Sequence, residues 1–152
     1  MRTLIYSKLE PASGNATSAL RLAEGLRERG EVFIRALPPN VPDDPAASAR
    51  EIQALRQVRE ENGITLAIGI HCYRAGTLLQ LAFGDAATQT PYVLVASGTD
   101  VNVNLQKKPQ DAALTQAIAH AAGLVSLSPD IFDKLAQLLA GVCFHLAGNR
   151  AT

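Results

Sequence analysis

The chain of 152 residues lacks an excess of charge of either sign and has few cysteines. Lysine and arginine total 14 residues, as do aspartate and glutamate, so the formal net charge is zero. A neutral chain gives no reason to expect a general attraction to nucleic acid or to an acidic membrane. The two cysteines, Cys72 and Cys143, have neither CxxC spacing nor the neighbours of a metal site. We therefore expect no metal and no nucleic-acid partner.

Long apolar runs are absent as well. No stretch approaches the roughly 20 apolar residues of a membrane-spanning helix. The N-terminus, MRTLIYSKLEP, lacks the long apolar core of a secretory signal. A cytoplasmic, reducing location is therefore the default expectation.

Two glycine-rich phosphate-binding fingerprints are missing. Neither GxGxxG, typical of dinucleotide-binding turns, nor GxxxxGK[ST], typical of P-loops, occurs in the chain. The first absence removes the main support for a nicotinamide-dependent oxidoreductase.

The chain does contain a regular alternation of strand-like and helix-like segments. We expect strands at residues 2–6, 31–37, 64–70, 91–97, 124–127 and 142–146. Helices are expected at residues 15–29, 45–62, 77–83 and 109–121, and from Ser128 onward. Two of the strand segments, 64–70 and 91–97, are apolar almost throughout, which indicates burial on both faces.

This alternation predicts an α/β fold, a Rossmann-like three-layer α/β/α sandwich with a parallel sheet of about six strands. Residues 1–146 would form one domain, and 147–152 a tail or the start of a linker. The proline-rich stretch 38–45 predicts an exposed loop, after which Asp43 or Asp44 caps a helix. That helix mixes arginines with glutamates, including Glu51, and predicts a solvated charged face.

Ligands of such sheets bind at the loops that follow the carboxyl ends of the strands. The first of these loops, 7–15, leads directly into a helix, whose N-terminal N–H groups favour anions. Gly14 permits either a close backbone approach or a positive φ, and Ser13 or Asn15 could cap the helix. The alternative is a capped turn without a ligand.

Two more loops combine polar and small residues. His71 and Arg74 follow the buried segment 64–70, and the planar guanidinium suits phosphate or carboxylate. Their alternative is a half-buried histidine beside an arginine that reaches solvent. The end of 91–97 and the residues after it supply further candidates for ligand contact, Ser97, Gly98, Thr99, Asp100 and Asn102. Asp100 is the best candidate for a base or a hydroxyl-binding carboxylate, against the alternative of an Asx-rich turn.

Other reactive side chains have simpler explanations. Ser126 to Asp130 is explained by helix capping at Ser128, with Pro129 in the first turn. Nothing around Cys72 indicates an activated thiolate, so a small buried residue is expected there.

Four segments, in order along nearly the whole chain, resemble the N-terminal half of retaining GT-B glycosyltransferases of the family 4 type. The first resembles their strand, glycine loop and first helix, and the third resembles their segment ending in His-Gly-Thr-Asp. The segments are SKLEPASGNATSALRLAEGLRERG, LAIGIHCYRAG, PYVLVASGTDVN and HAAGLVSLSPDIFDKL. Ser97 stands where many members of that family carry the histidine.

The resemblance implies one half of a two-domain enzyme that transfers a sugar from a nucleotide-sugar donor to an acceptor. This chain would be the acceptor-side domain, inactive without the missing C-terminal domain, and would need neither a further cofactor nor a metal. Ser13, Gly14 and Asn15 would approach the donor diphosphate or the acceptor. His71 and Arg74 would line the cleft, and Thr99 and Asp100 would lie at the catalytic or acceptor position.

The partners implied are a small-molecule donor and acceptor and the missing domain, with peripheral membrane contact and a homodimer left open. Without the resemblance, the glycine loop at Gly14 supports another hypothesis. In it, the chain is a stand-alone Rossmann-like module that binds a nucleotide or a phosphorylated metabolite.

Overall fold

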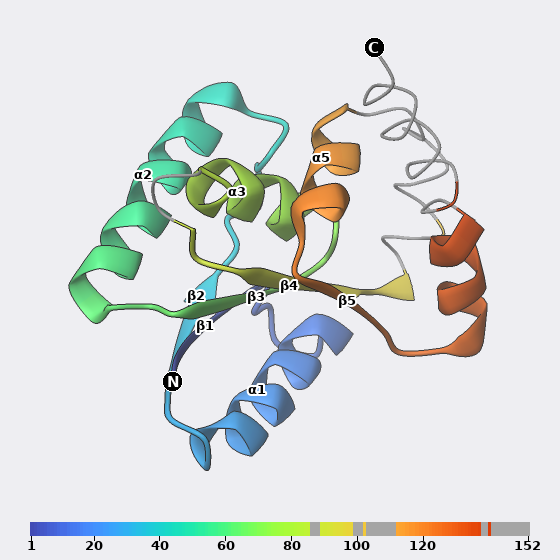
Figure 1. Cartoon of the computed structure of the whole chain (residues 1–152), viewed down its shortest axis with the longest axis horizontal. Helices are drawn as coiled ribbons and strands as arrows, with labels where there is room; N and C mark the ends of the chain where they lie inside the picture. Colours follow the sequence, from blue (N-terminus) through green and yellow to red (C-terminus); the bar gives the residue numbers. More distant parts are fainter. Residues whose placement is uncertain (86–88, 99–101, 103–111, 138–139, 141–152) are drawn as a thin grey trace.

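The protein folds as a parallel β-sheet between two layers of helices (Figure 1). The computed structural model describes residues 1–85, 89–98, 102, 112–137 and 140. Its strands are β1 (Arg2–Ser7), β2 (Glu31–Ala36), β3 (Leu66–Ile70), β4 (Tyr92–Ala96) and β5 (Gly123–Ser126). Its labelled helices are α1 (Gly14–Arg27), α2 (Pro45–Asn62), α3 (Arg74–Phe83) and α5 (Ala112–His120). Residues 129–137 are also helical.

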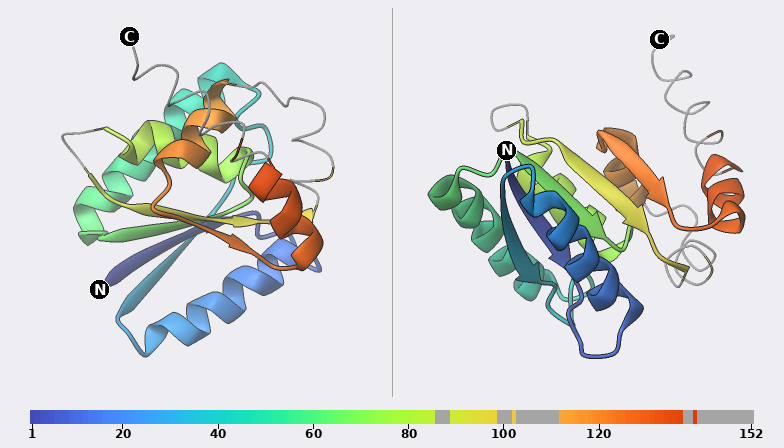
Figure 2. Two further views of the ribbon diagram at one scale, coloured as in Figure 1. Left: turned by 45° about the vertical axis from the view of Figure 1, so that its right-hand side comes forward. Right: turned by 90° about the horizontal axis from the view of Figure 1, so that it is seen from below.

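The five strands lie in the order β2-β1-β3-β4-β5, and all neighbouring pairs are parallel. Helix α1 covers one face of the sheet, while α2, α3 and α5 cover the other (Figure 2). The α/β class and the parallel sheet are as predicted from the alternating segments. The sixth expected strand, 142–146, lies outside the described residues, and so do 109–111 of the helix expected at 109–121.

Two hydrophobic clusters, one on each face of the sheet, hold the layers together. Along β1, Leu4 and Tyr6 belong to the larger cluster under α2, α3 and α5, while Ile5 belongs to the cluster under α1. This division follows from the alternation of side chains along a strand. In β4, Leu94 and Val95 divide between the same two clusters. The burial expected on both faces of the central strands is therefore confirmed.

Helix ends follow local capping chemistry. The Ser13 hydroxyl accepts a hydrogen bond from the Ala16 N–H (3.1 Å) and begins α1. Asp44, rather than Asp43, caps α2: its carboxylate accepts from the N–H groups of Ala46 and Ala47, and a proline occupies the first turn. Gly63 ends α2 in the left-handed conformation, at φ 58°, which glycine adopts at little cost.

The expectation that the third helix begins at Thr77 is wrong, because α3 begins at Arg74. Glycine has a low helix propensity, so the glycine at position 76 by itself predicts a loop. In the fold it serves packing: a Cβ atom there would lie 3.1 Å from Cδ1 of Leu94 on β4. Residues 74–76 are therefore the first turn of α3 and not part of the loop.

The expectation that the charged side chains of α2 are exposed to solvent is wrong for Glu51. The Glu51 side chain is 7% exposed and accepts two hydrogen bonds from Arg35 on β2, at 2.7 and 2.8 Å. Bidentate pairing with a guanidinium offsets much of the cost of burying the carboxylate. The pair ties α2 to the edge strand of the sheet, and the buried Tyr6 hydroxyl lies beside it.

In the part of the chain that the structure describes, no helix has the length and apolar character needed to cross a bilayer.

We predict that two buried tyrosines make the fold sensitive to alkaline pH. Burial, and then Glu51, raise the pKa of Tyr6, while burial raises the pKa of Tyr92. Above about pH 10 the unfolded chain releases these protons while the folded chain keeps them. The free energy of unfolding should then fall with pH, by up to about 1.4 kcal/mol per pH unit for each tyrosine, and should be insensitive to them at lower pH.

Urea unfolding between pH 9 and 11 measures this dependence. Tyr6→Phe and Tyr92→Phe should each flatten the decline, because each removes one titrating group. An alkaline decline of equal steepness in the wild-type protein and in both variants would contradict the assignment.

Candidate functional site

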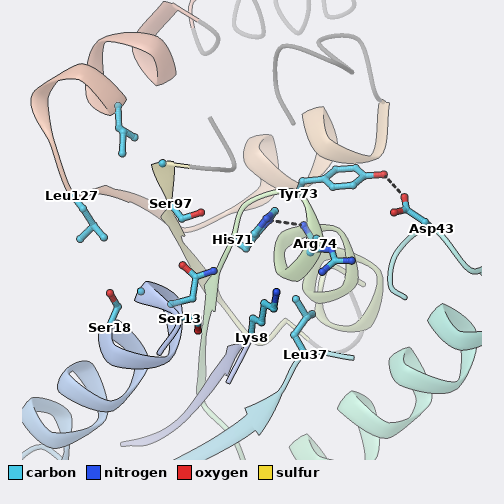
Figure 3. Close-up of a pocket in the computed structure, with 14 residues that line it drawn as sticks. Lys8, Ser13, Ser18, Leu37, Asp43, His71, Tyr73, Arg74, Ser97 and Leu127 are labelled. Carbon is cyan, nitrogen blue, oxygen red and sulfur yellow. Dashed lines mark hydrogen bonds between the residues drawn. The ribbon is translucent and has the colours of Figure 1, made fainter. Parts of the chain in front are cut away.

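A pocket of about 660 Å³ lies at the carboxyl edge of the sheet (Figure 3). Residues that follow each of the five strands contribute to its walls. They are Lys8, Ser13, Gly14, Asn15 and Ser18 after β1, Leu37 and Asp43 after β2, His71, Tyr73 and Arg74 after β3, Ser97 and Gly98 after β4, and Leu127 and Ile131 after β5. The strand order reverses between β1 and β3, which is where open α/β sheets bind ligands.

The N-terminus of α1 forms one side of the pocket. Ser13, and not Asn15, caps the helix, and Gly14 is its first residue. Of the two alternatives for Gly14, a positive φ is excluded, since the positive φ of this loop falls on Ala12 (63°). A Cβ atom at Gly14 would meet nothing within 4 Å, so the backbone there is open to close approach from the pocket. Close approach is thus the role that fits this glycine.

His71 is held in an unusual backbone conformation at the end of β3. Its φ is 98°, a region that costs non-glycine residues about 1–3 kcal/mol. Its N–H donates to the Val95 carbonyl (3.1 Å), and its Nδ1 accepts from the Arg74 N–H (3.2 Å). In the neutral ring, the proton therefore lies on Nε2. The side chain is buried rather than half-buried, and it fixes the first turn of α3 while lining the pocket.

Arg74 and Tyr73 join α3 to the loop that follows β2. The Arg74 guanidinium donates to the Pro39 carbonyl, and the Tyr73 hydroxyl donates to the Asp43 carboxylate (3.0 Å). Arg74 therefore does not simply extend into solvent. A guanidinium carries five N–H donors, so the bond to Pro39 leaves this side chain able to hydrogen-bond an anion as well.

Lys8 is a lining residue that the sequence did not single out. It follows β1 directly, and its Nζ lies 3.0 Å from Glu10, whose own side chain is 61% exposed and does not line the pocket. Lys8 and Arg74 face a single carboxylate, Asp43, among the described lining residues. Glu10 offsets much of the Lys8 charge, so the preference for an anionic ligand rests on the N–H donors of Lys8 and Arg74 together with the N–H groups of α1. Its place directly after a predicted strand is the feature of the sequence that could have identified Lys8 as a pocket residue.

The third predicted loop is described in part. Ser97 is buried and lines the pocket with Gly98, while Thr99 and Asp100 lie outside the described residues. Asn102 is exposed, is not among the lining residues, and accepts a hydrogen bond from Lys134 Nζ (2.6 Å). The roles assigned to Thr99, Asp100 and Asn102 stay predictions.

The chemistry of the described lining suits binding through cations, hydroxyls and N–H groups. In the described part of the chain, no group of three or more His, Cys, Asp or Glu side chains could hold a metal ion. Cys72 is fully buried, as expected for a small core residue. A comparison of the chain with models of known protein families finds no match.

Gly14→Val should weaken anion binding without weakening the fold. Gly25 is the matched control, because it lies in the same helix, a Cβ there also meets nothing within 4 Å, and it does not line the pocket. We expect both valine variants to stay within about 0.5 kcal/mol of the wild type in unfolding free energy. Only Gly14→Val should raise the Kd for pyrophosphate, about tenfold, measured by titration calorimetry.

Thermal unfolding of the same samples separates binding from folding. If Gly14→Val lost stability in proportion to affinity, Gly14 would serve the turn rather than a ligand.

Proposed function

We propose that this chain is the N-terminal, acceptor-side domain of a retaining glycosyltransferase, and that its pocket binds a phosphate-bearing part of a sugar donor or acceptor. The observation that carries the proposal is the convergence of three loops far apart in the sequence. Ser13–Asn15, His71–Arg74 and Ser97–Gly98 all contribute to one pocket. These are loops on which the resemblance to family 4 glycosyltransferases rests.

The charge of the pocket supports a phosphate group. Lys8 and Arg74 are both on the walls, and the backbone of Gly14 is accessible at the positive end of α1. Charge-assisted hydrogen bonds to phosphate are about twice as strong as neutral ones, and a guanidinium offers two parallel donors. The proposal includes a cytoplasmic location, where nucleotide sugars would be available.

The proposal assigns catalysis to this chain only together with a second domain. GT-B enzymes place most of the donor on the C-terminal domain, so this chain should bind its ligands weakly and transfer no sugar alone. A second function also has support, because loops that follow five strands of this chain line the pocket without a further domain. A stand-alone module for a nucleotide or a phosphorylated metabolite would use the same walls.

Lys8→Gln should weaken binding of a nucleotide sugar, with UDP-glucose as a representative probe. Removing the cation eliminates one charge-assisted contact, and we expect the Kd to rise about tenfold. The matched control is Arg21→Gln, which removes one positive charge from an exposed position on α1 that does not line the pocket. Its Kd should change less than about twofold, since exposed charges at a distance are screened by salt.

Calorimetric titrations with nucleoside diphosphates, nucleotide sugars and sugar phosphates decide between the two functions. Tight binding of a free nucleotide by this chain would favour the stand-alone module. Failure to bind any of these anions, or equal losses in Lys8→Gln and Arg21→Gln, would count against an anion site in this pocket.

A further inference from the structure

Asp43 is the one acidic residue among the described residues that line the pocket. A carboxylate repels a phosphate that binds nearby, so its presence among the N–H donors of the pocket lowers the affinity for a bare anion. This cost is offset when the ligand also brings hydrogen-bond donors to the carboxylate. An ionised carboxylate accepts about four hydrogen bonds and donates none, so hydroxyl or ammonium groups suit it.

The position of Asp43 is fixed from both sides. The Tyr73 hydroxyl donates to its Oδ1 at 3.0 Å, and Tyr73 is itself buried. Next to it, the Asp44 N–H donates to the Asn40 carbonyl (2.9 Å), while Arg74 holds the Pro39 carbonyl. The loop between β2 and α2 is therefore pinned to the first turn of α3, and the carboxylate is held in place before a ligand arrives. Such preorganisation lowers the entropic cost of binding.

The charges follow an order across the pocket. In Figure 3, Ser13 and Ser18 of α1 lie at one end, and Asp43 with Tyr73 lies at the other. Lys8 and Arg74 lie between them. A ligand that extended from α1 to the loop after β2 would contact N–H groups and cations at one end and a hydrogen-bond acceptor at the other.

We propose that Asp43 determines specificity by accepting hydrogen bonds from the hydroxyl groups of a sugar whose phosphate binds near Lys8 and α1. This inference rests on the proposed function and names the ligand class more narrowly, as a polyhydroxylated phosphate ester. Tyr73 is a positioning residue, because its hydroxyl orients the carboxylate. In this arrangement Asp43, oriented by Tyr73, binds the sugar hydroxyls, while Lys8 and the N-terminus of α1 bind the phosphate.

A matched pair of probes separates these two parts of the pocket. Glucose 1-phosphate and cyclohexyl phosphate have similar size and charge, but the second has no ring hydroxyls. We expect the wild-type chain to bind glucose 1-phosphate about tenfold more tightly in calorimetric titrations, the effect of one charge-assisted hydrogen bond. In Asp43→Ala this ratio should fall to about one, with cyclohexyl phosphate bound as well as before or better.

Two further variants control the experiment. Tyr73→Phe keeps the carboxylate but removes the hydroxyl that orients it, so the ratio should fall to an intermediate value. Glu24→Gln removes one negative charge from an exposed position of α1 that does not line the pocket, and it should leave both affinities unchanged. Thermal unfolding of every variant reports whether the loop and α3 remain packed.

The outcomes distinguish this inference from the proposed function. If Asp43→Ala kept the tenfold preference, or if the wild type bound both esters equally, the role of Asp43 would be overturned while anion binding stood. If the wild-type chain bound neither ester, the proposed phosphate site would fail, and the role of Asp43 with it.

Discussion

Parallel pairing of every strand in the sheet is the constraint on which the pocket depends. It brings the carboxyl ends of all five strands to one edge, although the residues that follow them range from Lys8 to Ile131 in the sequence. At the centre, the chain leaves β1 for α1 on one face and leaves β3 for α3 on the other. The two connections diverge at this point, and the pocket, which is lined mainly by polar residues, lies between them. Burial of the strands on both faces keeps this edge fixed.

The first turn of α3 connects the sheet, the pocket and the loop after β2. The His71 ring accepts a hydrogen bond from the Arg74 N–H. The Tyr73 hydroxyl donates to the Asp43 carboxylate, and the Arg74 guanidinium donates to the Pro39 carbonyl. The backbone strain at His71 is offset by these bonds and by its own N–H bond to Val95. Strained residues with several fixed partners are typical of functional positions, because a relaxed loop would not keep its side chains in place.

Much of the architecture follows from the sequence, because apolar runs such as 64–70 and 91–97 leave few alternatives to a buried parallel strand. The convergence of Ser13, His71 and Ser97 follows in turn, since parallel strands share an edge. Other features of the site and the fold depend on contacts between residues far apart in the sequence. Asp43 is fixed by a residue 30 positions away, and Glu51 resembles any charged residue of a surface helix until Arg35 is placed against it. The sequence does not predict the start of α3, because Gly76 disfavours a helix locally and is explained only by the close packing of α3 against Leu94 on β4.

The amino-terminal edge of the sheet has a consequence for handling the protein. At Gly30, a Cβ atom would lie 1.9 Å from the Met1 carbonyl oxygen, and the Glu31 N–H donates to the same oxygen at 3.1 Å. Met1 is thereby held at the edge opposite the pocket, where β1 and β2 begin. A fluorophore or an affinity tag attached at Met1 would leave the carboxyl edge unobstructed. Immobilisation through this end therefore leaves the pocket accessible on a sensor surface.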